Sequence, residues 1–218
     1  MSDSVSGAVA PGVELVAAYA TGFPGSQVAF KTHPSLRHVL IVQANAYVKA
    51  TVCDVESGAA TPAFSAAWAR YMRATRQNDY PTVYVQASGS QSIIDAFNAI
   101  REPLPFFWLA DWDGSPAAYL TNNVIPGPGD VVAHQYFGGV NVSWDLSGVV
   151  RYWPGVDVMP YHPPSPLMDN AQWVWIRYTY IPDHFTTLAD REHAWAELSA
   201  APAKAKALVL KYAPPNIR

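Results

Sequence analysis

The amino-acid sequence predicts an α/β fold: a modified, trimmed (β/α) barrel of mainly parallel strands with a C-terminal appendage. Three observations support this prediction. Short strand-like segments recur along the first part of the chain, amphipathic helical segments separate some of them, and the composition changes near residue 158. We therefore expect a barrel over residues 1–158 and a small strand and helix extension over residues 159–218.

The strand-like segments are rich in Val, Ile and aromatic residues, and their apolar residues are often consecutive. Uninterrupted apolar character is typical of strands that are covered on both faces, as in a parallel sheet or a barrel. The expected strands cover residues 13–19, 38–42, 48–55, 82–86, 106–111, 131–136 and 142–150.

Two helices are predicted between strands in the centre of the chain. Thr61 and Pro62 suit the start of the first, because Thr is a good N-cap and Pro is favoured at the first helical position. Apolar residues then recur at three-and-four spacing over residues 63–77, and again over residues 90–101, so each helix has one apolar face. The order strand, helix, strand, helix, strand predicts right-handed parallel crossovers. Too few helices are evident for eight strand–helix units, so the barrel is expected to be trimmed.

The last quarter of the chain differs in composition from the predicted barrel. Residues 161–166 are rich in proline and predict an extended arm. The alternation over residues 173–180 favours a strand, and residues 187–200 favour a helix with Thr187 as its N-cap. Residues 203–212 are basic and predict a further helix. We expect this module to dock on the barrel or on a partner.

The composition argues against several classes of partner. Half of the 218 residues are apolar, 14% are charged and the net charge is −3, so we expect no nucleic acid and no anionic membrane surface held by charge. No apolar run is long enough to span a membrane. The N-terminus lacks the basic and apolar regions of a signal peptide, and we expect synthesis in the cytoplasm. The single cysteine, Cys53, is expected to be a small buried hydrophobe.

Motifs for metals, phosphates and dinucleotides are absent from the sequence. The histidines show no metal-ligand spacing, and there is no Gly-x-Ser-x-Gly elbow, phosphate-binding loop or dinucleotide fingerprint. We therefore expect neither a metal nor another cofactor. The content of 8 Trp, 12 Tyr and 8 Phe permits a glycan ligand, because aromatic rings form flat apolar platforms for sugars, although aromatic residues also dominate protein cores.

Asp54 and Glu56 end a predicted strand with one residue between them, so their side chains point to the same face. Their α-carbons are expected to lie about 6.6 Å apart, at roughly 3.3 Å per residue. Carboxylates at such a distance can cleave a glycosidic bond: one protonates the leaving oxygen and the other stabilises charge at the anomeric carbon. The turn at Ser57 and Gly58 puts them at the carboxyl end of the strand, where barrel active sites lie. Two surface acids at a strand end would give the same pattern.

Two more acids, Asp111 and Asp145, end or interrupt predicted apolar strands. Acids in apolar strands are costly unless they are paired, hydrogen-bonded or exposed in a pocket. If the sheet closes, acids at three strand ends converge, and like-charge repulsion raises the pKa of at least one of them, as a general acid requires. All four acids are therefore expected in one concave site.

Five segments, taken in order, resemble family-25 glycoside hydrolases (muramidases) and their smaller glycoside-hydrolase-like relatives in bacteria and phages. They are DVESGAATP at 54–62, TVYV at 82–85, FWLADWDG at 107–114, AHQY at 133–136 and WDLS at 144–147. The resemblance implies a modified (β/α) barrel that acts on the glycan of bacterial cell walls. It implies that Glu56 is the acid, that Asp54 helps to set its ionisation, and that Asp111 and Asp145 orient substrate or charge. The residues that would line the cleft are Tyr19, Thr21, Tyr84, Trp108, Gln135 and Tyr136.

One position departs from the pattern of this family. In the family the first strand ends in an aspartate that faces the cleft, whereas the matching position here is Thr21. A hydroxyl cannot supply the negative charge that stabilises a cationic transition state. We therefore expect weak or absent cleavage, and a gain of activity when Thr21 is replaced by Asp.

Two functions remain open from the sequence. The first is a muramidase-like hydrolase that binds and cleaves cell-wall polysaccharide, which the four acids favour. The second is a non-catalytic structural or adhesion subunit of a phage particle, which Thr21 and the C-terminal module favour. In that case residues 159–218 would contact other virion subunits or a second copy of the chain, and the protein would be incorporated in the particle or released by lysis.

Overall fold

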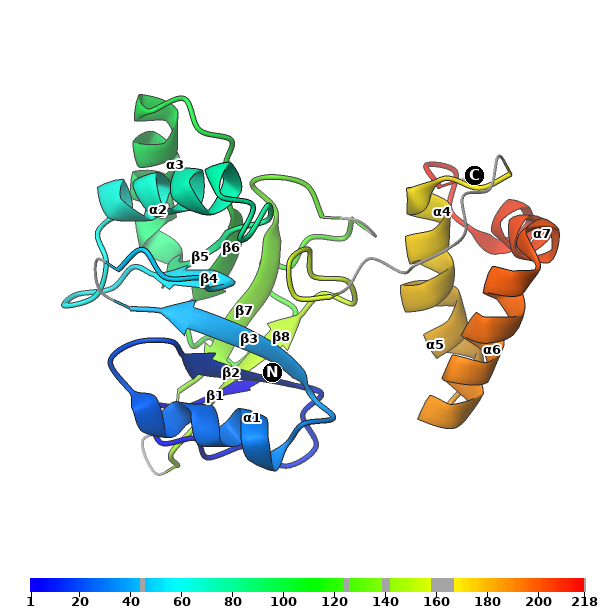
Figure 1. Cartoon of the computed structure of the whole chain (residues 1–218), viewed down its shortest axis with the longest axis horizontal. Coiled ribbons are helices and arrows are strands. Elements are labelled where there is room, and N and C mark those ends of the chain that lie inside the picture. Colours follow the sequence, from blue (N-terminus) through cyan, green and yellow to red (C-terminus); the bar gives the residue numbers. More distant parts are fainter. Residues whose placement is uncertain (44–45, 124–125, 139–141, 158–166, 218) are drawn as a thin grey trace. The chain divides into compact units, whose positions relative to one another are not determined.

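The computed structural model describes residues 1–43, 46–123, 126–138, 142–157 and 167–217 (Figure 1). The chain divides into two compact units, one of residues 1–122 with 126–157 and one of residues 158–218 with 123–125. The first unit is a β-barrel with helices and the second is helical. The predicted proline-rich arm, residues 161–166, lies outside the described residues.

Eight strands close the barrel in the order in which they occur along the chain. Strands β1 to β7 pair in parallel with their neighbours, and β8 is antiparallel to both β7 and β1. The strands are β1 (Ser2–Asp3), β2 (Leu15–Tyr19), β3 (Arg37–Val42), β4 (Val52–Asp54), β5 (Thr82–Gln86), β6 (Phe106–Ala110), β7 (Val131–Phe137) and β8 (Asp145–Val149). The prediction of an α/β barrel of mainly parallel strands is therefore confirmed.

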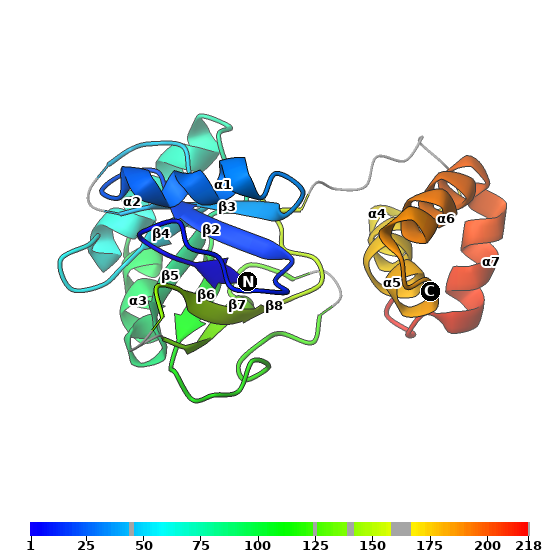
Figure 2. The same cartoon turned by 90° about the horizontal axis from the view of Figure 1, so that it is seen from below.

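Helices occupy only some of the connections between strands. Helix α1 (Val28–Thr32) follows β2 through the short helix η1 (Pro24–Gln27), α2 (Pro62–Ala74) follows β4, and α3 (Ser90–Ala99) follows β5 through η2 (Ala87–Gly89). Figures 1 and 2 show α2 and α3 side by side on the outside of the barrel. The side chain of Thr61 accepts a hydrogen bond from the backbone N–H of Phe64, which confirms the predicted N-cap.

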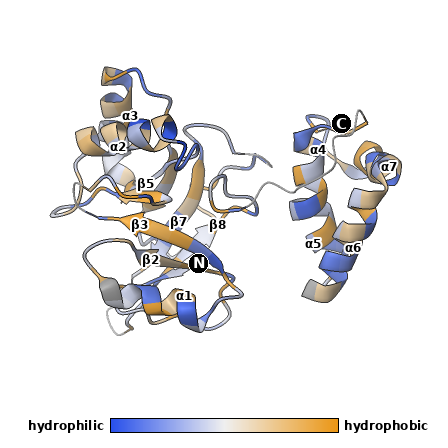
Figure 3. Cartoon of the chain, in the orientation of Figure 1, coloured by the Kyte–Doolittle hydropathy of each residue, from blue (hydrophilic) through white to orange (hydrophobic). Residues whose placement is uncertain are grey.

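Alternation along the strands separates an inner layer from an outer one. In β6, Phe106, Trp108 and Ala110 belong to the core inside the barrel, whereas Phe107 and Leu109 pack outward in a second core. The outer core includes Cys53 of β4, which is fully buried, and the α2 and α3 side chains. In Figure 3 the strands β3, β5 and β7 are mostly coloured as hydrophobic, as expected when both faces are covered.

Two strands differ from the prediction. Strand β1 has only two residues, Ser2 and Asp3, and it was not predicted, so the expected first strand at 13–19 is in fact the second. The expected strand at 142–150 is β8, but it runs antiparallel to its neighbours. The start of β8 therefore lies at the end of the barrel where the parallel strands finish. We call this end the mouth.

The opposite end of the barrel carries an ion pair whose carboxylate is buried. Arg37, the first residue of β3, donates from Nη1 to both carboxylate oxygens of Asp157, at 2.7 and 2.8 Å. Asp157 also accepts a hydrogen bond of 2.6 Å from the backbone N–H of Trp153. The indole of Trp153 in turn donates to the Thr82 hydroxyl at the start of β5. These contacts join three segments that are distant in the sequence.

The C-terminal unit consists of helices. Helix α4 (Asn170–Trp175), the π-helical turn η3 (Ile176–Tyr180) and α5 (Ile181–His184) are consecutive, and α6 (Leu188–Ala200) and α7 (Pro202–Tyr212) follow. The predicted helices at 187–200 and 203–212 are confirmed, with Thr187 as N-cap of α6. Among the described residues, none of the helices combines the length and the apolar character needed to cross a membrane.

The predicted strand at 173–180 is wrong, since this segment is helical. Its start is fixed by a capping box, in which the Asp169 side chain accepts from the backbone of Gln172 and the Gln172 side chain accepts from the backbone of Asp169. Four consecutive residues are then buried: Trp173, Val174, Trp175 and Ile176. Three of these four belong to the unit's own apolar core. The strand expected in this module is therefore not present, and most of its aromatic residues are buried or half-buried in helices.

Candidate functional site

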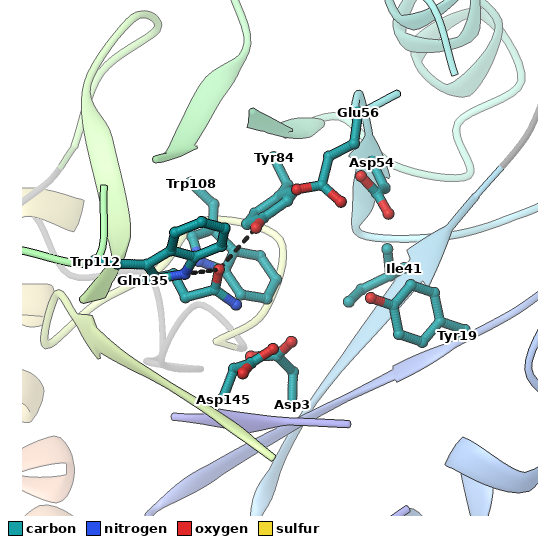
Figure 4. Close-up of a pocket in the computed structure, with 10 residues that line it drawn as sticks. All are labelled: Asp3, Tyr19, Ile41, Asp54, Glu56, Tyr84, Trp108, Trp112, Gln135 and Asp145. Atoms are coloured by element: carbon teal, nitrogen blue, oxygen red, sulfur yellow. Dashed lines mark hydrogen bonds between the residues drawn. The ribbon is translucent and has the colours of Figure 1, made fainter. Parts of the chain in front are cut away.

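A cavity of about 180 Å³ lies at the mouth of the barrel (Figure 4). Its walls combine carboxylates with aromatic rings. The lining residues are Asp3, Tyr19, Ile41, Asp54, Glu56, Tyr84, Trp108, Trp112, Gln135 and Asp145. We call this cavity the carboxylate pocket.

Each carboxylate reaches the pocket because of its place on a strand. Asp54 is the last residue of β4, two residues after the inward-facing Val52, and Glu56 follows two residues further on. Asp3 ends β1, and Asp145 begins the antiparallel strand β8. The closed barrel brings these ends together, and Figure 4 shows Asp3 and Asp145 on one side of the pocket, opposite Asp54 and Glu56.

The sequence prediction missed three residues that line the pocket, Asp3, Ile41 and Trp112, and Asp3 is the one carboxylate among them. It ends the first strand of the barrel, at the place where an aspartate was expected. Thr21 instead follows the second strand, does not line the pocket, and donates a hydrogen bond of 2.7 Å to the backbone oxygen of Gln43. The assignment of the first-strand position to Thr21 was therefore wrong. A usable signal was the Ser-rich turn up to Gly7 after Asp3, which resembles the Ser57-Gly58 turn after Glu56.

Asp3 and Asp145 are directly opposed across an antiparallel pair of strands. Opposed α-carbons in such a pair lie about 4.5–5.5 Å apart, so the two carboxyl groups are close neighbours. Only 5% of the Asp3 surface is exposed. Burial raises its pKa from 3.8 to about 7, the charge of Asp145 adds to the rise, and a hydrogen bond from the Gln135 side chain opposes it.

Asp54 has a similar environment on the other side of the pocket. It is 2% exposed, and burial raises the pKa of its carboxyl from 3.8 to about 7. The charges of Glu56 and then of Asp3 add to this rise. Glu56 itself is exposed at the mouth. The pocket therefore holds two buried carboxyls whose pKa values are raised to about 7, the exposed Glu56 and the partly buried Asp145.

The amide of Gln135 is held by two donors in the wall of the pocket. Its oxygen accepts one hydrogen bond of 2.7 Å from the hydroxyl of Tyr84 and another of 3.1 Å from the indole N–H of Trp112. With the amide oxygen oriented in this way, its N–H₂ group points toward Asp3 (Figure 4). The indole N–H of Trp108 donates to the Ser147 hydroxyl at 3.1 Å. The aromatic walls are thus fixed by hydrogen bonds as well as by packing.

Three predicted site residues do not line the carboxylate pocket: Asp111, Tyr136 and Thr21. Asp111 follows Phe107 and Leu109 at intervals of two, and these residues face away from the barrel interior. It is exposed, and its Oδ2 accepts a hydrogen bond of 2.6 Å from the Tyr119 hydroxyl. Tyr136 directly follows the inward-facing Gln135, where the pairing of β7 with β8 shifts its register.

The remaining predicted residues do line the pocket, namely Glu56, Asp54, Asp145, Tyr19, Tyr84, Trp108 and Gln135. Burial raises the pKa of the Tyr19 and Tyr84 hydroxyls, so both stay protonated and can donate hydrogen bonds. Among the described residues, no group of three His, Cys, Asp or Glu side chains has an arrangement suited to a metal ion. The site is arranged for proton transfer next to clustered negative charge.

Comparison of the chain with protein-family models, with curated proteins and with solved structures gives no match.

Proposed function

We propose that the protein is a muramidase-like glycoside hydrolase that binds bacterial cell-wall glycan at the barrel mouth and cleaves it in the carboxylate pocket. The observation that carries the proposal is the convergence of Asp3, Asp54, Glu56 and Asp145 with the aromatic walls of one pocket. Cleavage of a glycosidic bond needs a proton donor and a nearby carboxylate, and sugar rings bind well to aromatic faces.

Glu56 is the proposed proton donor, because the resemblance gives it this role and it is the most exposed of the four carboxyls, where a glycan can reach it. Its proton passes to the glycosidic oxygen, the bond from that oxygen to the anomeric carbon breaks, and the bonding electron pair stays with the oxygen. The carboxylates of Asp3 and Asp145 stabilise the positive charge that develops on the sugar. Water then adds to the anomeric carbon, and its proton returns to a carboxylate of the pocket.

Asp54 and Asp3 contribute through their ionisation. Both have pKa values of about 7, so their charge changes as protons move nearby. The charges of Glu56 and Asp54 repel each other. Protonation of Asp54 therefore removes a negative charge from the surroundings of Glu56. Because Asp3 supplies a first-strand carboxylate, the expectation of weak activity that depended on Thr21 no longer applies.

The space around the pocket suits a polymer. A second cavity, of about 330 Å³, continues from the carboxylate pocket and shares Asp3, Tyr19 and Asp145 with it. Its other walls include Trp144, Ser4 and Ser6. A glycan chain can therefore extend past the acids on this side, with an aromatic ring and hydroxyl groups alongside it.

The test is release of reducing sugar ends from purified bacterial cell walls. We expect the wild-type protein to release them and the Glu56→Gln variant to lose about 10²–10⁴-fold in rate, because the amide has no transferable proton. Glu14→Gln is the matched control, since Glu14 is exposed and does not line the pocket. Equal rates for wild type and Glu56→Gln would contradict the assignment. Binding to the walls without release by the wild type would instead support a non-catalytic, structural subunit.

A further inference from the structure

A third cavity at the mouth, of about 170 Å³, lies against the carboxylate pocket. It is lined by Gln86, Ala87, Ser88, Ala110, Asp111 and Trp112. Trp112 also lines the carboxylate pocket, so its indole stands between the two cavities. The third cavity begins where β5 and β6 end, beside the site of the proposed cleavage.

The loop after β6 holds two aromatic residues in strained backbone conformations. Trp112 has a φ of +43° and Tyr119 a φ of +65°, although neither is glycine. Such a conformation is unfavourable for a residue with a side chain and persists only where the surrounding structure imposes it. Strained residues of this kind are concentrated at functional sites.

Each strained residue fixes one wall of the third cavity. The indole N–H of Trp112 donates a hydrogen bond of 3.1 Å to the Gln135 side chain. The residue remains exposed, with 56% of its surface accessible. The Tyr119 hydroxyl donates a hydrogen bond of 2.6 Å to Oδ2 of Asp111. A carboxylate offers about four acceptor positions, so Asp111 can still accept from a ligand.

We propose that this third cavity is a sugar subsite, which binds the hexopyranose unit next along the glycan chain cleaved in the carboxylate pocket. The Trp112 indole stacks on the sugar ring, and Asp111, Gln86 and Ser88 bind its hydroxyl groups. Asp111 is then a substrate-binding residue, and Tyr119 is a positioning residue that orients it. The chemical class of the ligand follows from the proposed function, and the subsite itself follows from the geometry of the loop.

An apolar ring beside planar polar side chains is suited to a sugar in particular. A pyranose presents an apolar face of C–H groups and an equatorial belt of hydroxyls. The exposed indole covers the apolar face of the sugar, and the carboxylate, amide and hydroxyl groups form hydrogen bonds with the sugar hydroxyls. A ligand without hydroxyl groups would leave the polar side chains of the cavity unpaired, which costs binding free energy.

Binding is measured by calorimetry with a soluble β-1,4-linked N-acetylglucosamine hexamer, in the full chain carrying Glu56→Gln so that no cleavage occurs. Loss of one hydrogen bond to a charged group weakens binding about tenfold, which we expect for Asp111→Ala. Removing the aromatic platform in Trp112→Ala should weaken it about 10–100-fold. Trp112→Phe keeps a stacking ring and should restore most of the affinity. Asp95→Ala, an exposed acid on α3, is the matched control and should bind as the parent does.

A second readout separates binding from chemistry. In the otherwise wild-type chain, Asp111→Ala should raise KM for cell-wall glycan about tenfold and leave kcat within about twofold, because a binding residue outside the carboxylate pocket does not act on the reacting atoms. Tyr119→Phe should raise KM less, because Asp111 remains but is no longer oriented. Melting temperatures of all variants show whether each is folded.

The two proposals fail in different ways. Equal affinity of Asp111→Ala, Trp112→Ala and the control for the hexamer would overturn the subsite, even if Glu56→Gln abolishes cleavage. A fall in kcat with unchanged KM for Asp111→Ala would also overturn it, because Asp111 would then act in the chemical step. Absence of binding to both the hexamer and purified cell walls would contradict the proposed function itself.

Discussion

The two ends of the barrel bury carboxylates in opposite ways. At the amino end of the parallel strands, Asp157 accepts two hydrogen bonds from Arg37 and one from the Trp153 backbone. At the mouth, Asp3 and Asp54 are at least as deeply buried, yet their neighbours are other acids. Within the described part of the chain, the Oδ1 atoms of both are buried without a hydrogen-bond partner.

This difference separates stability from function within one fold. Burying a carboxylate is costly unless a cation or several donors compensate for lost water. Asp157, the paired acid at the amino end of the parallel strands, joins distant segments of the barrel. The acids at the mouth are compensated only in part, at Asp3 by the Gln135 side chain and the N-terminal ammonium, so they lower stability. What they provide is a pair of carboxyl groups with pKa values of about 7. We expect mutations at the two ends to have opposite effects on folding.

The largest effect on stability is expected from Arg37→Ala. It leaves the Asp157 carboxylate buried without its cation, which typically lowers the free energy of unfolding by about 3–5 kcal/mol. Chemical denaturation at neutral pH measures this change. The control is Arg70→Ala, whose ion pair with Glu102 is half exposed on the arginine side and should change stability by less than about 1 kcal/mol. The release of reducing ends per folded molecule of Arg37→Ala should equal that of the wild type. A loss of this activity without a loss of stability would mean that the amino end of the barrel takes part in function.

Asp3→Asn should raise the free energy of unfolding, in contrast to Arg37→Ala. Asp3 releases its proton near pH 4 in the unfolded chain and near pH 7 in the folded one, so the folded state binds more protons between these values. The wild-type protein therefore loses stability as the pH rises from about 4 to 7, and the asparagine variant does not lose this part. We expect Asp3→Asn to be more stable than wild type by about 2–4 kcal/mol at pH 8, and the gain to disappear below pH 4.

Urea unfolding at several pH values tests this prediction. Asp54→Asn should behave in the same manner, since burial raises the pKa of Asp54 to about 7 as well. Asp95→Asn, on the exposed surface of α3, should show no such pH dependence. A gain of equal size at pH 4 and pH 8 would show that the charge of Asp3 is not its source.

The smallest effect is expected at Thr21. Its hydroxyl donates to the backbone oxygen of Gln43, and a carboxylate cannot donate, so Thr21→Asp should lower the free energy of unfolding by about 1 kcal/mol. Thr21→Ser keeps the donor and should match wild type. Because Asp3 already supplies the first-strand carboxylate, Thr21→Asp should not raise the release of reducing ends. A clear rise in activity would restore Thr21 as a residue of the site.

Local pattern was sufficient to predict much of the barrel. Consecutive apolar residues located most of the strands, and Thr61-Pro62 located the start of α2, because capping and periodicity involve neighbours in the sequence. The two-residue period placed Asp54 and Glu56 on one face, and both line the pocket. The same period, applied to β6, would have placed Asp111 on the face opposite Trp108.

The alternation over residues 173–180 misled the prediction in the C-terminal unit. Residues 173–176 are all buried in a helix, so the alternation does not mark a buried and an exposed face of a strand. The capping box from Asp169 to Gln172 was the local signal for a helix.

The sequence by itself determined most of the strands and helices of the barrel, and it determined that acids and aromatic residues lie near strand ends. Only the tertiary structure decided which of these acids meet. Strand β1 is too short to show any period, and Ser2 and Asp3 form a strand only because β2 and β8 pair with them on either side. The antiparallel direction of β8 then places Asp145 opposite Asp3. Closure of a barrel is a long-range condition on pairing, and no window of neighbouring residues contains it.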